Sequence, residues 1–129
     1  MIYGEHIIKS ENLDLSFKDQ TAILYNSVKY EGNLSKLNAD RIELFTGPYA
    51  KEFPNDRYRA IEQYVKCSEV ANDIDIEINA GHDLNQNNLK FFCQSVKNTK
   101  EVSIGHALVT ESLYNGLEST IKSYLQILK

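Results

Sequence analysis

The sequence has no apolar stretch near the ~20 residues that a membrane-spanning helix needs. Its start, MIYGEHIIKSEN, lacks the apolar core of a signal peptide. It also has no lysine or arginine cluster longer than a pair, and its formal net charge is −4. Sequence-independent binding to a phosphate backbone needs clustered positive charge. We therefore expect a cytoplasmic protein that binds neither membranes nor nucleic acid.

Cysteine is scarce, with two residues in 129. Cys67 and Cys93 both fall in predicted helices, and they form neither a CxxC pair nor another metal-ligand spacing. We interpret them as free thiols that pack in the core, as is usual in a reducing compartment. We expect neither a metal nor a cofactor.

Proline and glycine are few, with two and six residues, while 42% hydrophobic and 25% charged residues are ordinary for a globular protein. A domain of this size can bury about two-thirds of the surface that its unfolded chain exposes. No internal repeat, low-complexity tract or linker marks a boundary. We predict a single domain over residues 1–129.

From residue 38 onward, strand-like and helix-like patterns alternate three times. The predicted strands are 41–45, 75–79 and 102–104, and predicted helices follow them at 54–71, after His82 and at about 111–128. The helix after His82 carries Leu89, Phe92, Cys93 and Val96 on one stripe. The last helix carries an apolar stripe that can cover a sheet, formed by Leu113, Leu117, Ile121, Leu125 and Leu128. Three consecutive strand–helix units imply a parallel sheet with right-handed crossovers, so the predicted class is α/β.

The first third of the chain gives a weaker pattern. Residues Leu13 to Phe17 alternate like a strand, and Thr21 to Tyr30 fits either a short helix or another strand. Both alternatives stay open for that segment.

Two of the three histidines follow a glycine at the end of a predicted strand, in INAGHDL (78–84) and VSIGHAL (102–108). Ligands of parallel α/β sheets bind at the carboxyl ends of the strands. Glycine lets backbone N–H groups approach a ligand, and a helix that begins after His82 would favour phosphate. Histidine suits acid–base chemistry or contact with phosphate. A histidine at the end of a strand is nevertheless more often an ordinary loop residue, or a core residue whose ring nitrogens have hydrogen-bond partners.

Two acidic residues belong to the same region. Glu43 alternates with Ile42 and Leu44, so we predict that it points to the opposite face, into a lumen or cleft, unless it is only solvent-facing or salt-bridged. Asp83 has a structural alternative, because Asp83 to Gln86 matches a helix N-cap with glutamine at the third position. Spacing alone leaves a phosphate-ligand site and ordinary packing both open.

Four runs of residues resemble the C-terminal half of the pyridoxine 5'-phosphate synthase family. They are ADRIELFTGPYA (39–50), NAGHDLN (79–85), SIGHAL (103–108) and YNGLE (114–118), in the family's order and near its spacing. The resemblance covers roughly residues 34–129 and implies strand–helix units six to eight of a (β/α)8 TIM barrel. Residues 1–33 match no unit of the family well.

The resemblance also implies an activity. The family condenses 1-deoxy-D-xylulose 5-phosphate with 3-amino-2-oxopropyl phosphate to form pyridoxine 5'-phosphate in vitamin B6 biosynthesis. By resemblance, Glu43 is the active-site glutamate of strand six and His82 is the proton donor of strand seven. Asp83 stands where the family contacts the amino-oxopropyl substrate, often with glycine. Gly105 and His106 match the pair that holds the phosphate of that substrate.

The sequence also departs from the family. A complete barrel needs ~250 residues, and the first-half segments with the Asn-Ile-Asp-His strand end, the strand-two histidine base and the strand-three glutamate have no counterpart in these 129 residues. The alternative function is therefore a truncated, non-catalytic half barrel that binds a phosphorylated ligand. A half barrel exposes sheet edges, so we expect either a homo-oligomer or pairing with a missing N-terminal half.

Overall fold

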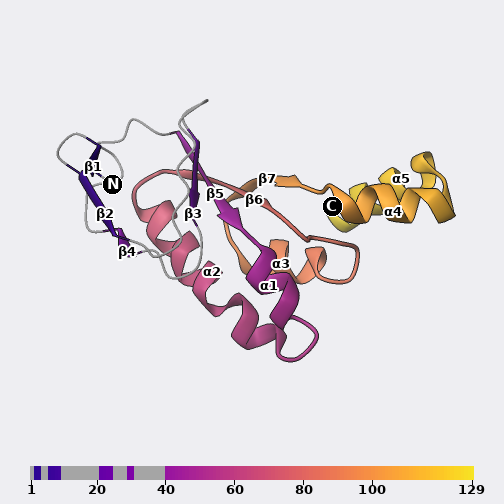
Figure 1. Ribbon diagram of the computed structural model, residues 1–129, viewed down its shortest axis with the longest axis horizontal. Coiled ribbons are helices and arrows are strands. Elements are labelled where there is room, and N and C mark those ends of the chain that lie inside the picture. Colours follow the sequence, from indigo (N-terminus) through magenta and orange to yellow (C-terminus); the bar gives the residue numbers. More distant parts are fainter. Residues whose placement is uncertain (1, 4–5, 10–20, 25–28, 31–39) are drawn as a thin grey trace.

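The computed structural model describes residues 2–3, 6–9, 21–24, 29–30 and 40–129. From residue 40 onward, strands and helices alternate along the chain (Figure 1). Their order is β5 (Arg41–Phe45), α1 (Gly47–Glu52), α2 (Arg57–Asp73), β6 (Glu77–Gly81), α3 (Leu89–Ser95), β7 (Thr99–Ser103), α4 (His106–Asn115) and α5 (Leu117–Ile127). Before them come four strands, β1 (Ile2–Tyr3), β2 (His6–Lys9), β3 (Thr21–Leu24) and β4 (Lys29–Tyr30).

The main sheet has four strands in the order β3-β5-β6-β7, and every pair of neighbours is parallel. The register places Glu43 beside Asn79, and Gly81 lies between Phe45 on β5 and Ser103 on β7. The carboxyl ends of these strands therefore meet at one edge of the sheet. A parallel sheet with helical connections confirms the predicted α/β class.

The early strands resolve one alternative left open by the sequence. Residues 21–24 form a strand, β3, that pairs with β5, and 29–30 form β4, so the helix alternative is wrong for these residues. Strand β2 pairs antiparallel with both β1 and β4 in a second sheet. The alternation predicted at 13–17 lies outside the described residues.

The core fills the space between one face of the main sheet and helices α1, α2 and α3, which lie on the same side of it (Figure 1). Ile42 and Ile78 point into this space and are buried. The ring of Tyr49 lies 5.2 Å from that of Phe92 and 5.8 Å from that of Tyr64, in edge-to-face contacts. Burial of such side chains stabilises the fold by roughly 1.5–3 kcal/mol each, so this face anchors the sheet.

Several predicted boundaries differ from those of the structure. The turn predicted at 46–48 starts a short helix, α1, because Pro48 suits a first helical position. Helix α2 begins after Pro54 because Asp56 is its N-cap, and its carboxylate accepts the backbone N–H groups of Tyr58 and Arg59. Strand β6 begins at Glu77 rather than residue 75, and β7 already begins at Thr99.

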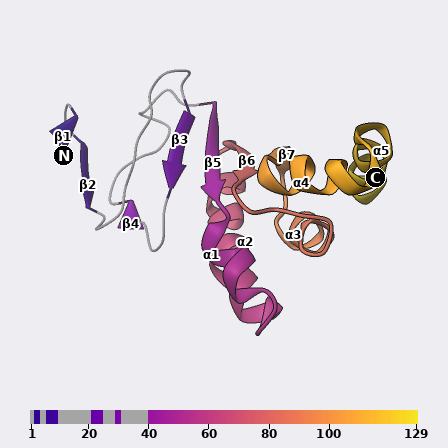
Figure 2. The same cartoon turned by 45° about the vertical axis from the view of Figure 1, so that its right-hand side comes forward.

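The single helix predicted over 111–128 is wrong. The structure has two helices, α4 and α5, which meet at Gly116, where φ is +79°. The predicted apolar stripe does not cover the sheet, because its five members are all exposed and Leu113 is 80% exposed. Thr120 and Tyr124 form the buried side of α5 instead. Figures 1 and 2 show α4 and α5 extending away from the sheet.

Two smaller findings complete the fold. None of the helices in the described part of the chain combines the length and apolar character that crossing a bilayer requires. Cys67 and Cys93 are free thiols packed against the core, and burial raises the pKa of both.

Candidate functional site

Glu43 lies on the face of the main sheet that the core helices do not cover. Its neighbours Ile42 and Leu44 are buried on the core side, whereas Glu43 is partly exposed, so the predicted alternation is confirmed. Its carboxylate lies directly over Gly81 of the next strand, where a Cβ would sit 2.6 Å from Oε1. Glycine at position 81 therefore makes the room that the carboxylate occupies.

His82 follows β6 in an unusual backbone conformation. Its φ is +89°, and that of Asp83 is +58°, so two consecutive non-glycine residues lie in the left-handed region. Such conformations cost about 1–3 kcal/mol each and tend to cluster at functional sites. The side chain of His82 is 52% exposed, so a substrate or solvent proton can reach it.

The imidazole of His82 is held on two sides. Its Nδ1 lies 2.9 Å from Oδ2 of Asp83, within ion-pair distance. Its ring meets the ring of Phe45 edge-on, with the centroids 4.5 Å apart. The contact with Asp83 occupies Nδ1, so Nε2 is the ring nitrogen left to meet a ligand.

The backbone at the end of β6 is held by Thr46, which is fully buried. Its backbone N–H donates to the carbonyl of Gly81 at 2.7 Å. Its hydroxyl lies 2.7 Å from the same carbonyl oxygen and also donates to the carbonyl of His82. The end of β5 is thereby tied to the strained turn after β6.

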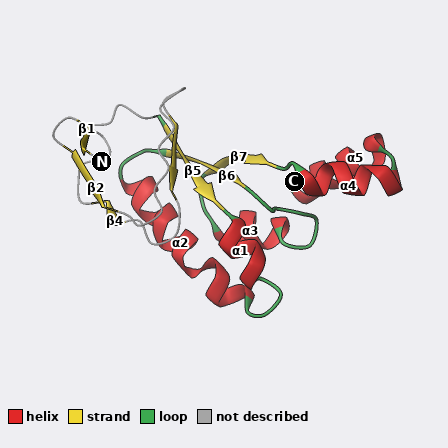
Figure 3. Ribbon diagram, in the orientation of Figure 1, coloured by secondary structure: helices red, strands yellow, loops and turns green. Residues whose placement is uncertain are grey.

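The helix predicted to begin directly after His82 is absent, and the capping interpretation of Asp83 is wrong. Helix α3 begins only at Leu89, after the loop that Figure 3 shows in green between β6 and α3. Asparagine side chains shape this loop: Oδ1 of Asn88 accepts the backbone N–H of Asn85 at 2.9 Å. Asp83 turns its carboxylate to His82 instead of capping a helix.

The second Gly-His pair does adjoin a helix. His106 is the first residue of α4, and Gly105 is its N-cap. Both residues are exposed, and a Cβ at Gly105 would meet no heavy atom within 4 Å. The first backbone N–H groups of a helix have no intrahelical partner and attract anions. The phosphate-favouring helix end therefore lies at His106 rather than at His82.

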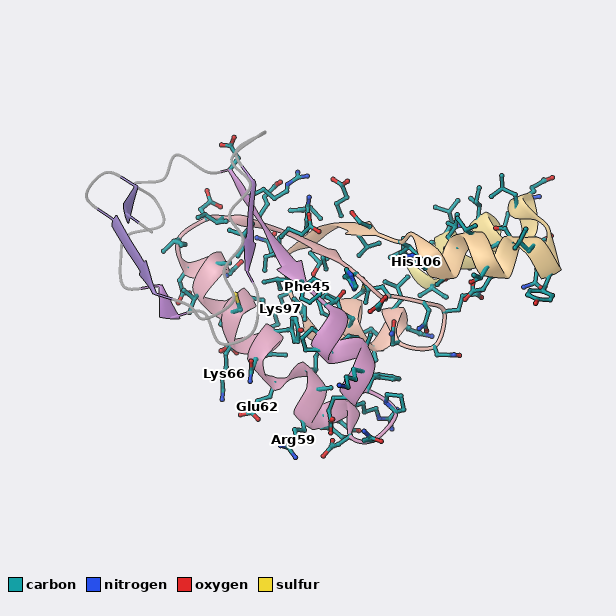
Figure 4. All side chains as sticks on the ribbon, viewed as in Figure 1. Phe45, Arg59, Glu62, Lys66, Lys97 and His106 are labelled. Carbon is teal, nitrogen blue, oxygen red and sulfur yellow. The ribbon has the colours of Figure 1, made fainter. Side chains whose placement is uncertain are left out.

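The structure joins the predicted residues into two groups. Glu43, His82 and Asp83 gather around Gly81 at the ends of β5 and β6, and Gly105 and His106 lie just beyond β7. Figure 4 labels Phe45 at the end of β5 and His106 at the start of α4. Among the described residues, no hydrogen bond or ion pair joins the two histidine side chains.

A hydrogen bond joins the loop that follows the first group to the helix that carries the second group. Nε2 of Gln86, in the loop after His82, donates to Oε2 of Glu111 on α4 at 2.7 Å. Glu111 also lies near Tyr124 of α5, and burial together with this carboxylate raises the pKa of that phenol. The loop that carries His82 and the helix that begins at His106 are therefore coupled.

Asn79 was not singled out from the sequence, although it shares the open face with Glu43. It lies between Glu43 and Glu101 in the register, and its Oδ1 is buried without a hydrogen-bond partner among the described residues. Its position two residues before Gly81 on an alternating strand was the available signal. Thr46 was also missed, although it lies inside a quoted motif.

Charged side chains pair with one another at the opposite end of the open face, where the strands begin. Arg41 donates to Glu77 from Nε at 3.1 Å and to Glu101 from NH1 at 3.0 Å. These partly exposed pairs raise the pKa of the guanidinium, mainly through the hydrogen bond with Glu77. The described residues contain no group of three or more histidine, cysteine, aspartate or glutamate side chains that could hold a metal ion.

Comparison with known proteins agrees with the resemblance. The family described as pyridoxal phosphate biosynthesis protein PdxJ matches residues 26–129. The pyridoxine 5'-phosphate synthase of Christiangramia forsetii is 43% identical over 112 residues, which are 85% of this chain and 47% of that protein. Those of Parabacteroides distasonis and Porphyromonas gingivalis are 48% and 49% identical over 90 residues, covering 70% of this chain and 38% of each protein. The chain thus spans less than half the length of these curated relatives.

Proposed function

We infer the function from one premise: this chain belongs to the PdxJ family of pyridoxal phosphate biosynthesis proteins. We propose that it carries the second-half site of a pyridoxine 5'-phosphate synthase. The reaction condenses 1-deoxy-D-xylulose 5-phosphate with 3-amino-2-oxopropyl phosphate. We also propose that residues 1–129 are one domain, in which 34–129 form strand–helix units six to eight of a TIM barrel.

The proposal rests on one observation: His82, strained and half-exposed, lies beside Phe45 at the carboxyl end of β5. His82 would donate a proton to the substrate, because its Nδ1 is engaged by Asp83 and its Nε2 is left for the ligand. Glu43 would act on the same substrate from the adjoining strand. The side chain of Asp83 is turned to His82, so its backbone would make the contact with the amino-oxopropyl substrate.

The phosphate of that substrate would bind at the start of α4. Gly105 leaves the approach open, and the unpaired N–H groups of the first turn of a ten-residue helix would bind the phosphate. His106 would add an imidazole contact from the first helical position. The two Gly-His pairs would therefore have different roles: proton transfer at His82 and phosphate binding at His106.

A product assay tests the proposal. The purified chain is incubated with both substrates, and pyridoxine 5'-phosphate is measured by mass, with His82→Ala as the matched inactive variant. We expect product from the unsubstituted chain and a large loss in the variant. Absence of product from the unsubstituted chain would contradict the catalytic proposal.

A second function is favoured by one specific observation: the sequence has no counterpart of the acid–base groups in the first half of the family. The alternative is a non-catalytic half barrel that binds a phosphorylated ligand. Phosphate binding with no product would support this alternative, whereas loss of both would contradict it as well.

The exposed apolar face of α4 and α5 supports a partner. Among the described residues, most of the exposed large apolar side chains lie on these two helices or at their end: Val109, Leu113, Tyr114, Leu117, Ile121, Leu125 and Leu128. We propose that a second copy covers this face.

The edges of the parallel sheet also support two copies. Strands β3 and β7 are its two edge strands, and one copy supplies four parallel strands. Two copies related by a twofold axis parallel to the strands would supply eight parallel strands, the number in a TIM barrel.

Light scattering during size-exclusion chromatography tests this assembly. We expect a dimer, which Leu125→Glu should dissociate because it places a charge in the apolar face. Val70→Glu is the matched control, since Val70 is also exposed but lies on α2, away from this face. A well-folded monomer of the unsubstituted chain would contradict the proposal.

A further inference from the structure

Thr46 connects the end of β5 to the backbone that presents His82. It is fully buried, and both of its hydrogen-bonding groups, the backbone N–H and the hydroxyl, donate to the end of β6. We propose that Thr46 is a positioning residue that holds His82 in its strained conformation and so aims the imidazole at the substrate. The inference rests on the proposed role of His82 as proton donor.

The strain at His82 and Asp83 requires such a residue. Two successive positive φ values in non-glycine residues persist only where the surrounding structure over-determines them. Both side chains are about half exposed, so close packing around them does not supply the constraint. The hydroxyl of Thr46 reaches the carbonyls of Gly81 and His82, one on each side of the His82 α-carbon, and restrains the backbone where the left-handed conformation begins.

The neighbours of Thr46 restrain the side chain of His82 at the same time. Phe45 places its ring edge-on to the imidazole, at 4.5 Å between the centroids. Gly47 leaves room for both rings, because a Cβ there would lie 3.3 Å from Nδ1 of His82 and 2.7 Å from the ring of Phe45. Thr46 thus restrains the backbone of His82 and Phe45 its ring, while Gly47 leaves the space that both rings occupy.

The hydroxyl is the decisive group, since the backbone N–H of residue 46 would survive most substitutions. Valine has nearly the shape of threonine and would keep the packing, but it would remove the hydroxyl that contacts the carbonyls of Gly81 and His82, while the backbone N–H of residue 46 would still donate to Gly81. Serine would keep the donor and lose only a methyl group. Thr46→Val and Thr46→Ser therefore separate hydrogen bonding from packing.

NMR spectroscopy of the full chain tests the proposal. In Thr46→Val the residue 46 amide keeps its own bond to Gly81, but we expect it to exchange about tenfold faster, because loss of the hydroxyl's hydrogen bond lets the strand ends open more easily. We also expect changes in the His82 coupling that reports its φ and in its ring-proton shifts beside Phe45. The ring of His106 is the internal control and should not change, and Thr46→Ser should resemble the unsubstituted chain.

Unchanged coupling and ring shifts of His82 in Thr46→Val would overturn the proposal, as would equal changes in the serine variant. If the valine variant does not fold, the unsubstituted chain still decides. Its Thr46 hydroxyl proton should exchange slowly with water and show contacts to the His82 backbone, and a rapidly exchanging hydroxyl would overturn the proposal. These measurements need no substrate, so they remain valid if the catalytic proposal fails.

Discussion

The carboxylate of Glu43 lies over the α-carbon of Gly81, so close that a Cβ on residue 81 would sit 2.6 Å from Oε1. This contact joins the two strands that carry the proposed catalytic groups, because His82 directly follows Gly81. The small residue at the end of β6 thus sets where the carboxylate can lie.

Gly81→Ala should therefore disturb the site more than the fold. The flexible end of Glu43 can move away, but a Cβ at 81 would also lie 3.2 Å from the Cβ of Ser103, so we expect a loss of unfolding free energy of about 1 kcal/mol, with a displaced carboxylate. The measurement is chemical denaturation of the variant, together with its product assay.

The matched control is Gly81→Ala in a Glu43→Ala background. Removing the carboxylate relieves the close contact, so alanine at 81 should cost less there than in the unsubstituted chain. An equal cost in both backgrounds would show that Glu43 does not limit the space at position 81.

The two Gly-His pairs should respond differently to substitution. His106→Ala should weaken binding of the amino-oxopropyl substrate, because it removes a phosphate contact. His82→Ala should mainly lower turnover in any active assembly. Steady-state kinetics and substrate binding measure the difference, and equal losses at both positions that follow stability alone would count against both roles.

Local patterns predicted the sheet well and the last helices poorly. The alternation of Ile42, Glu43 and Leu44 is a period-two signal within one strand, and the structure confirms it. The apolar stripe on α5 was assigned to the sheet because sequence periodicity shows that a face is apolar but not what covers it. Gly116 was the signal for the break between α4 and α5, but a glycine inside a periodic pattern is also compatible with a continuous helix.

The same holds for the site: features set by neighbouring residues in the sequence could be predicted, and features set by residues far along the chain could not. The position of His82 at the end of a strand could be predicted from the glycine and the alternating pattern before it. The positive φ of Asp83 could not, because the local pattern fits a helix N-cap and carries no signal of the contacts that Thr46 makes with residues 35 and 36 positions further along the chain. The capping pattern at residue 83 is a local alternative, but the chain forms a loop there and the next helix begins only at Leu89.

Gly116→Ala should destabilise the last two helices. Its φ of +79° is unfavourable for any residue with a Cβ, although a Cβ there would meet no neighbouring atom within 4 Å. We expect a loss of about 1–2 kcal/mol in unfolding free energy from backbone strain alone. Ser119→Ala, on the exposed side of α5, is the control and should change stability by less than about 0.5 kcal/mol. A neutral Gly116→Ala would contradict the positive φ.

Alkaline pH should weaken the fold through buried tyrosines. Burial raises the pKa of Tyr64 to about 12, and its hydroxyl donates to the carbonyl of Phe45 at 2.9 Å. Burial also raises the pKa of Tyr49. Because the folded state favours the neutral phenol, this stabilisation is complete below the unfolded pKa of about 10 and is lost as the pH rises toward 12.

Denaturation from pH 8 to 11.5 measures this effect. Tyr64→Phe removes one of the titrating groups, so its stability should fall less steeply with pH than that of the unsubstituted chain. An identical slope in both proteins would show that Tyr64 does not contribute to the alkaline loss.

Binding of 3-amino-2-oxopropyl phosphate, followed through the backbone amides by NMR, tests most directly the claim that these strand ends form one substrate site. The account predicts that amides of residues 81–83 and 105–106 shift together on titration, and that His106→Ala weakens the binding. Shifts confined to the basic residues of α2, or no saturable shift at either strand end, would contradict it.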